Sequence, residues 1–185
     1  ISSHYDVGND FYELFLGESM AYTCAYYPTP DATLDEAQEN KFRLVFEKMN
    51  LKPGDRHLDV GCGWGSMVRY AARQGVKSLG VTLSKEQAEW AQAKIKEEGL
   101  EELAEVRFLD YRDVTETGFD GVSSIGLLEH IGVNNYASYF EFLAGKLRPG
   151  GVMVNHCITY PDNHKTPQGD FINRYIFPDG ELTGS

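Results

Sequence analysis

The amino-acid sequence predicts an open α/β fold with a mostly parallel sheet, and two observations carry this prediction. Helix and strand patterns alternate from about Ala32 onward, which is the order that gives parallel strands joined by right-handed crossovers. A glycine-rich turn, LDVGCGWGS at residues 58–66, also follows the first predicted strand and opens a helix. Because open α/β sheets bind ligands beyond the carboxyl ends of their strands, we expect the functional site at that edge.

Two predicted helices flank the first strand. Thr33 and Glu36 form the T-x-x-E pattern of a capping box, which marks the start of a helix. That helix ends near LKPG at residues 51–54, and a second helix covers about 66–73. The inner face of the first helix is predicted from apolar residues at helical spacing, namely Phe42, Val45, Phe46 and Met49.

Two more helices are predicted further along the chain. Ser84 and Gln87 form a second capping box, and Ala88, Ala91 and Ile95 line the inner face of the helix that follows. The segment NNYASYFEFLAGKL at 134–147 is the other helix, closed by an RPGG turn.

Short apolar runs between these helices predict five strands. They are RHLDVG at 56–61, VKSLGVTL at 76–83, VRFLD at 106–110, FDGVSSIGLL at 119–128 and VMVNHCI at 152–158.

The fourth strand is followed directly by a carboxylate and an imidazole, Glu129 and His130, and the fifth contains His156 near its end. Since the carboxyl ends of parallel strands share one edge, we expect Glu129 and His156 to face one cleft. Structural alternatives stay open. Glu129 could be a carboxylate at a helix N-terminus, His156 a satisfied core residue, and His130 only a hydrogen-bonding partner.

Composition limits the partners of the 185-residue chain. The formal net charge is −11, which disfavours nucleic acid and unassisted docking on anionic lipid. Three cysteines and no CxxC pair predict neither a closed disulfide set nor a zinc site. No apolar run approaches the roughly 20 residues of a membrane-spanning helix, so we expect a cytoplasmic protein. The first residue is Ile1 rather than Met.

The glycine loop predicts a nucleotide-type ligand. Gly61, Gly63 and Gly65 permit positive φ and a close approach of the backbone to a ligand. The spacing is GxGxG rather than the dinucleotide pattern GxGxxG, and the second strand ends in Thr82 rather than an acidic residue. Both features disfavour NAD. Cys62 is interpreted as a small residue packed in the turn.

Several motifs together resemble the cyclopropane-fatty-acyl-phospholipid synthases and the related mycolic acid cyclopropane synthases. The resemblance covers essentially the whole chain, with the motifs in order. GCGWG is shared with many methyltransferases, whereas HYDVGND, YTCAYY and RYIFPDG are more specific. The motifs are HYDVGNDFYELFLG, YTCAYY, LDVGCGWGS, GVTLSKEQ, DYRD, LLEHIG, VNHCI and NRYIFPDGEL.

The resemblance implies a Rossmann-like, class I S-adenosylmethionine (SAM)-dependent methyltransferase fold. It implies that Gln87, rather than an acidic strand end, helps to hold the ribose of SAM. The residues that it places around SAM are Tyr22, Thr23, Leu58, Asp59, Gly61, Gly63, Trp64, Gly65, Thr82, Leu83, Gln87, Tyr111 and Arg112.

The same resemblance implies an active site that holds bicarbonate as the base. Matched residue by residue, its bicarbonate-binding positions are Cys24, Glu129, His156 and Ile158. The implied reaction methylates the double bond of an unsaturated fatty acyl chain, after which deprotonation of the carbocation closes a cyclopropane ring. Tyr22, Tyr26 and Tyr27 are either aromatic cover for the cationic centres or ordinary core residues.

Alternative functions stay open at this point. A different fate of the carbocation would give methyl-branched, methylene-branched or methoxy-precursor chains, the first of these with a reductase partner. A general small-molecule methyltransferase is disfavoured by YTCAYY and RYIFPDG. A SAM-binding module without catalysis is disfavoured by the presence of both Glu129 and His156, although a fold alone never proves activity.

Two parts of the chain are expected. Residues 1–32 form an N-terminal lid or substrate-pocket segment, in which His4, Tyr5 and Asp6 open a short helix. Residues 33–185 form the SAM-binding domain, which we expect to be incomplete at its C-terminus because the full fold has further strands. The remaining lid residues are either lid packing or acyl-chain lining, and they are Phe11, Tyr12, Leu14, Phe15 and Leu16. An unsaturated acyl lipid, peripheral contact with the inner membrane and a homodimer are the expected partners and assemblies.

Overall fold

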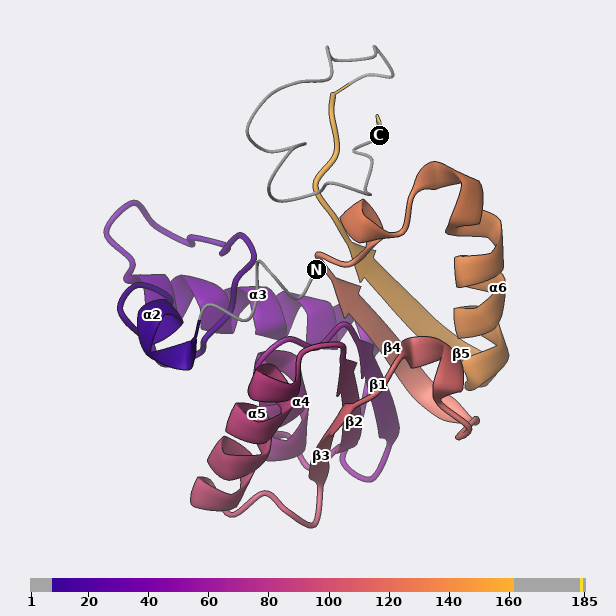
Figure 1. The fold of residues 1–185 in the computed structure, drawn as a ribbon, viewed down its shortest axis with the longest axis horizontal. Helices are drawn as coiled ribbons and strands as arrows, with labels where there is room; N and C mark the ends of the chain where they lie inside the picture. The colour runs from indigo at the N-terminus through magenta and orange to yellow at the C-terminus, as the bar shows by residue number, and fades with distance from the viewer. Residues whose placement is uncertain (1–7, 162–183, 185) are drawn as a thin grey trace.

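A five-stranded parallel sheet forms the centre of the computed structural model, which describes residues 8–161 and 184 (Figure 1). The strand order is β3-β2-β1-β4-β5, and every neighbouring pair is parallel. This confirms the predicted open α/β fold. The strands are β1 (Arg56–Val60), β2 (Lys77–Thr82), β3 (Ala104–Phe108), β4 (Phe119–Ile125) and β5 (Leu147–His156).

Helices cover both faces of the sheet (Figure 1). One face packs against α3 (Leu34–Met49), α4 (Ser66–Arg73) and α5 (Lys85–Glu97), and the opposite face packs against α6 (Tyr136–Lys146). Strand order reverses between β1 and β4, since the chain proceeds outward to β3 and then returns to the other side of β1. A crevice at such a switch point is where open sheets bind ligands. No helix of the described residues is long and apolar enough to cross a membrane.

The fourth strand is shorter than predicted. β4 ends at Ile125, and Gly126 turns the chain with φ 75°. Glu129 then lies in the short 3₁₀ helix η2 (Leu128–His130) rather than at the tip of the strand. The prediction overlooked the glycine because the residues after it are as apolar as the strand itself.

The RPGG segment is the second difference. Residues 148–151 lie inside β5 and do not form a turn before it. They occupy a register shift, since Phe119 pairs with Leu147 while Gly121 pairs with Val152. The turn-forming residues therefore bulge one strand of a continuous pair.

The N-terminal segment contains the helix α2 (Asn9–Glu13). Tyr12, Leu16 and Met20 are buried with Trp64, whereas Leu14 is 82% exposed. His4, Tyr5 and Asp6 lie outside the described residues, as does the RYIFPDG motif at 174–180. The predicted lid therefore packs through one side and leaves an apolar side uncovered among the described residues.

Both predicted capping sites are occupied. Thr33 and Glu36 form the complete capping box of α3, as the sequence predicts. At α5 the Ser84 hydroxyl accepts from the Gln87 backbone N–H at 3.3 Å. The Gln87 side chain, however, accepts a hydrogen bond from the Thr82 hydroxyl at 2.7 Å, so it serves the end of β2 instead of completing a capping box.

Replacing the α3 cap tests how far that helix depends on it. Thr33→Ala should lower the free energy of unfolding by about 1 kcal/mol, the usual cost of losing a hydroxyl cap. Chemical denaturation would measure the loss. Thr117→Ala, at an exposed position whose hydroxyl makes no such cap, is the matched control and should change stability by much less. An equal effect of the two substitutions would contradict the assignment.

Candidate active site

The glycine loop joins β1 to α4 and forms part of the candidate site. Gly61 and Gly65 have φ values of 71° and 73°, a region that favours glycine. A Cβ at Gly65 would also approach the side chains of Ala91 and Val106 to 3.1 and 3.0 Å. The loop glycines thus have the conformation that the sequence predicts, and they bring α4 close to α5 and β3.

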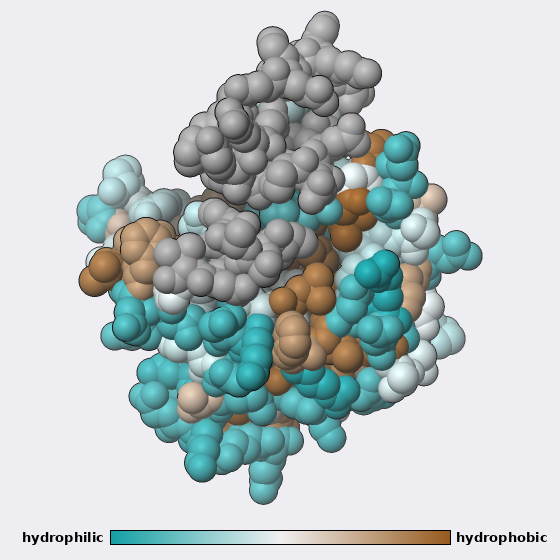
Figure 2. Space-filling model, viewed as in Figure 1, coloured by the Kyte–Doolittle hydropathy of each residue, from teal (hydrophilic) through white to brown (hydrophobic). Residues whose placement is uncertain are grey.

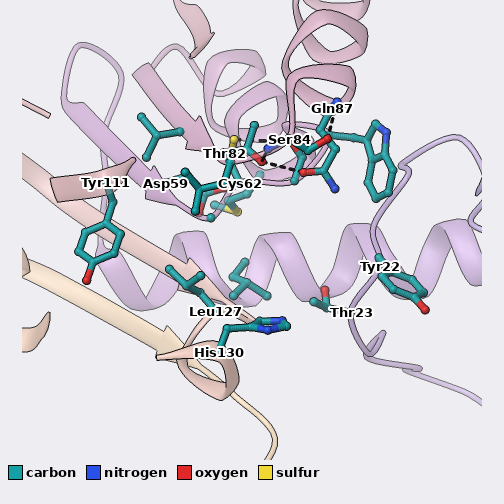
Figure 3. A pocket seen from close by; sticks show the side chains of 18 of the residues that line it. Tyr22, Thr23, Asp59, Cys62, Thr82, Ser84, Gln87, Tyr111, Leu127 and His130 are labelled. Carbon is teal, nitrogen blue, oxygen red and sulfur yellow. Dashed lines mark hydrogen bonds between the residues drawn. The ribbon is translucent and has the colours of Figure 1, made fainter. Parts of the chain in front are cut away.

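A cavity of about 430 Å³ opens beyond the carboxyl ends of β1, β2 and β4 (Figure 3). The residues predicted around SAM line it, with two exceptions. Leu58 is fully buried in the core on the α6 side of β1, and Gly65 faces α5. The predicted residues that line the cavity are Tyr22, Thr23, Asp59, Gly61, Gly63, Trp64, Thr82, Leu83, Gln87, Tyr111 and Arg112.

Further lining comes from segments that sequence reasoning did not select. Gly126 and Leu127 form part of the wall after β4, and His130 lies on the same side as Thr23 (Figure 3). His130, for which only a structural role was expected, therefore belongs to the cavity. Arg112 lines the rim, but its guanidinium forms a 2.6 Å ion pair with Asp110.

The turn after β2 presents a polar wall. Thr82 donates to Gln87 Oε1 and accepts from the Ser84 backbone N–H at 3.3 Å. Gln87 is 4% exposed, and the bond to its oxygen leaves the amide N–H groups as donors. Such a group suits sugar hydroxyls, which accept as well as donate hydrogen bonds.

Asp59 places a carboxyl group in the cavity floor at 2% exposure. Its Oδ1 accepts from the Ser123 hydroxyl, which also contacts His57 Nε2 at 2.9 Å. His57 Nδ1 in turn contacts the Ser78 hydroxyl at 2.7 Å. Burial raises the pKa of Asp59 to about 7, against the opposing effects of Ser123 and Lys41. Burial also lowers the pKa of His57 to about 3, so the imidazole is neutral.

Cys62 is buried, and its burial raises the pKa of the thiol well above its ordinary value. A thiol in this state is a poor nucleophile. This agrees with its interpretation as a packed turn residue.

The four residues matched to the bicarbonate positions lie together in a cluster of their own. Cys24 Sγ lies 3.5 Å from His156 Nε2, and Glu129 Oε1 accepts from the backbone N–H of Ile158 at 2.7 Å. Glu129 Oε2 and His156 Nδ1 are buried and have no hydrogen-bond partner among the described residues. Unpaired buried polar atoms are costly and uncommon, so this pair is suited to a ligand.

This cluster adjoins the cavity without lining it. Cys24 follows the cavity residue Thr23, Glu129 precedes His130, and the His156 carbonyl accepts from the Gly126 N–H at 2.9 Å. Glu129 and His156 therefore lie next to each other as expected, but beside the cavity and not in its lining. Burial lowers the pKa of His156, and nearby Lys41 acts in the same direction while Glu129 opposes it.

Two polar residues of α3 near this wall were not identified from the sequence. Gln38 and Lys41 are 2% and 3% exposed and contact the segment that carries Thr23. A signal was present, because Gln38 and Lys41 stand four residues before the inward-facing Phe42 and Val45. Polar residues at that spacing share the apolar stripe of a helix.

The whole chain, residues 1–185, matches the family model described as mycolic acid cyclopropane synthetase. It is 65% identical to a probable fatty acid methyltransferase of Mycobacterium tuberculosis, covering 100% of this chain and 44% of that protein. It is 41% identical to the cyclopropane-fatty-acyl-phospholipid synthase of Escherichia coli, covering 97% of this chain and 45% of that one. The chain thus spans about half the length of the curated relatives it matches.

A solved structure is also similar to this chain. The mycolic acid cyclopropane synthase CmaA1, in complex with SAH and CTAB, superposes with a TM-score of 0.87 at 36% identity. The match covers 100% of this chain and 69% of that one.

Asp59 should make stability depend on pH. The folded state keeps the Asp59 proton up to about pH 7, whereas an unfolded chain releases it near the ordinary value of 3.8. The contribution of Asp59 to stability therefore falls as pH rises between these values. Asp59→Asn is neutral throughout, so relative to the unsubstituted protein it should gain about 2 kcal/mol between about pH 5.5 and about pH 8.

Denaturant unfolding at the two pH values, without added ligand, measures this gain. Asp113→Asn, at an exposed aspartate, is the control and should show no such trend. A stability difference between Asp59→Asn and the unsubstituted protein that stays constant with pH would contradict the assignment.

Proposed function

Because the chain belongs to the mycolic acid cyclopropane synthetase family, we propose that it forms the SAM-binding and proton-transfer part of an enzyme that modifies unsaturated fatty acyl chains. In this proposal a carbon from the SAM methyl group is added to the double bond and a cyclopropane ring closes. The observation that carries the proposal is the cluster of Cys24, Glu129, His156 and Ile158, in which two buried polar atoms are unpaired among the described residues, beside the wall of the cavity.

The orientation of SAM follows from the polar groups of the cavity. The donors of Gln87 suit the ribose hydroxyls, and the glycine loop allows the backbone to approach the ligand closely. The sulfonium group then belongs on the side of Thr23 and Gly126, next to the cluster. Tyr22 is 39% exposed on that side, and its ring face would attract a cation.

The reaction needs a base beside a short-lived cation. One alkene carbon bonds to the methyl carbon as the bond from that carbon to sulfur breaks, which releases S-adenosylhomocysteine (SAH) and leaves a cation on the acyl chain. Loss of a proton from the transferred methyl group lets its carbon bond to the second alkene carbon. Since water would capture the cation, the base must lie in a site that excludes water.

The cluster, in which Glu129 is buried while Cys24 and Ile158 are exposed, fits a bound bicarbonate ion in part. Glu129 Oε2 and His156 Nδ1 are unpaired among the described residues, and the Cys24 thiol lies beside His156. The fourth expected contact differs, because the Ile158 N–H already donates to Glu129. A bicarbonate ion held there would supply the base for the methyl proton. The lowered pKa of His156 keeps the imidazole neutral with one N–H to donate, while Glu129 would accept the hydroxyl hydrogen of the ion.

A second candidate product is a methyl- or methylene-branched chain. The relative at 65% identity is named a probable fatty acid methyltransferase, and that name favours this alternative. A hydride shift from the methyl-bearing carbon to the neighbouring cationic carbon, followed by loss of a proton from the methyl group, would leave a methylene group, which a reductase partner would then saturate. The same cavity and cluster serve both outcomes, so the product decides between them.

Peripheral contact with a membrane is part of the proposal. The apolar side chains of α2 and the residues after it are exposed, with Phe11 at 50%, Leu14 at 82% and Phe15 at 46%. Figure 2 shows hydrophobic surface at the left edge of the molecule, where α2 lies. A lipid substrate must be drawn from its bilayer, and such a surface supports contact there.

A product assay tests the proposed function. The protein that carries this chain is incubated with SAM and an oleoyl phospholipid, and the lipid is analysed by mass spectrometry and proton NMR. We expect a mass gain of one CH₂ group together with cyclopropane ring protons. Exocyclic methylene protons would instead establish the branched product, and an unchanged lipid with SAH released from another acceptor would reject both.

Glu129→Gln tests the division between cofactor cavity and proton-transfer cluster. The amide can still accept from Ile158 but offers N–H groups where the carboxylate offers an acceptor. Turnover should fall by roughly 100-fold or more, the usual scale for losing a general base, because the ion proposed as the base would lose its acceptor on Glu129. The dissociation constant for SAM should change by less than about twofold, since Glu129 lies outside the cavity lining.

The exposed glutamate at position 101 supplies the control, and Glu101→Gln should leave turnover and binding unchanged. Turnover is measured as SAH formation and SAM binding by calorimetry. Parallel losses of turnover and SAM affinity in Glu129→Gln would show that the cavity and the cluster are not functionally separate.

A further inference from the structure

Lys41 is a buried lysine to which the proposed function assigns no role. It lies on the inward face of α3 and is 3% exposed. Its Nζ donates to the Thr23 hydroxyl at 2.7 Å and lies 4.8 Å from the centre of the Phe42 ring. Burial lowers its pKa to about 8, opposed by Cys24 and Asp59. Burying an ammonium group is costly, so the position needs a compensating interaction.

The bond from Lys41 fixes what the Thr23 hydroxyl can do. An ammonium group only donates, so Thr23 Oγ1 is the acceptor and keeps its own hydrogen to give to another group. The methyl group of Thr23 packs against Gly126, where an added Cβ would come within 2.7 Å of Thr23 Cγ2. Thr23 lines the cavity (Figure 3), so its hydrogen is available to a cavity ligand.

A carboxyl group lies on one side of the cavity and an ammonium group stands behind the other. Asp59 lies in the floor at the end of β1, and Lys41 stands behind Thr23 on the α3 side. SAM and SAH end in an amino acid, which carries an ammonium and a carboxylate. If the ribose lies at Gln87 and the sulfur beside the cluster, the amino-acid end reaches the region between Asp59 and Thr23.

We propose that Lys41 is a positioning residue for the cofactor, which holds the Thr23 hydroxyl as a hydrogen-bond donor to the carboxylate at the amino-acid end of SAM. This inference rests on the proposed function, because it requires SAM in the cavity. Lys41 itself does not line the cavity, so it acts through Thr23.

A purely structural role for Lys41 can be separated from this one. Gln38, one turn earlier on α3, donates to the backbone carbonyls of Ala21 and Thr23 at 3.3 and 2.9 Å. It holds the same segment in place without touching the Thr23 hydroxyl. Gln38 is therefore the matched control for Lys41, since both side chains are buried and both contact the same stretch of chain.

The experiment compares two ligands that differ only at the amino-acid end. SAH carries the ammonium and carboxylate, whereas 5′-methylthioadenosine is the corresponding nucleoside thioether without them. Binding of each is measured by calorimetry in the protein that carries this chain. The variants are Lys41→Met, Thr23→Val, their double substitution and Gln38→Met, each checked by thermal unfolding.

Lys41→Met and Thr23→Val should each weaken the binding of SAH by about tenfold or more, as expected for the loss of a hydrogen bond to a charged group. Both should change the affinity for 5′-methylthioadenosine by less than about twofold. The double substitution should cost about as much as either alone, because the two residues act as one unit. Gln38→Met should not distinguish the two ligands.

Equal weakening of both ligands by Lys41→Met, or no weakening of SAH by either Lys41→Met or Thr23→Val, would overturn the inference. Thr23→Val tests it independently if Lys41→Met does not fold. If the unsubstituted protein binds neither ligand, the proposed cofactor fails and the inference fails with it. If it binds both and the variants show no selectivity, the cofactor stands and only the role of Lys41 is rejected.

Discussion

Parallel pairing of the strands is the constraint on which the site depends. β1 pairs with β2 on one side and β4 on the other, and β4 continues the pairing to β5, with Ile125 opposite His156. All strands therefore end at one edge. Where the chain turns away from that edge, two glycines are closely packed against neighbouring side chains. A Cβ at Gly61 would come within 3.2 Å of Leu127, and one at Gly126 would come within 2.7 Å of Thr23. These two turns pack against cavity-lining residues, so the sheet determines where the walls of the cavity lie.

Much of the fold could be predicted from the sequence, because alternating patterns, caps and glycines are local signals. The errors also have local causes. Residues 127 and 128 extend the apolar pattern of β4, yet Gly126 has already turned the chain. The prediction of a turn at RPGG is wrong, because whether such residues form a bulge or a turn depends on the partner strand. Local pattern cannot supply that partner.

The cavity lining could be predicted largely through resemblance, whereas the buried polar residues behind it could not. His57 and Ser123 lie in apolar strands, and Gln38 and Lys41 lie on the apolar stripe of α3. A lone polar residue in such a position has no visible partner in the sequence. The partners of His57 are 21 and 66 residues away along the chain. Only the packed sheet brings them within hydrogen-bonding distance, and so the support becomes visible only in three dimensions.

In the proposed function, the separation of the cavity from the cluster meets two different chemical needs. A ligand with a charged amino-acid end needs polar walls, while a carbocation needs a base shielded from water. Glu129 is 2% exposed and lies outside the cavity lining, whereas Asp59 lines the cavity. Lys41 is close to both the cavity and the cluster. It donates a hydrogen bond to Thr23 in the cavity wall, and it contributes to the lowered pKa of His156 in the cluster. In the proposed function, Lys41 would therefore orient a donor for the cofactor, and it adds to the burial that lowers the pKa of His156.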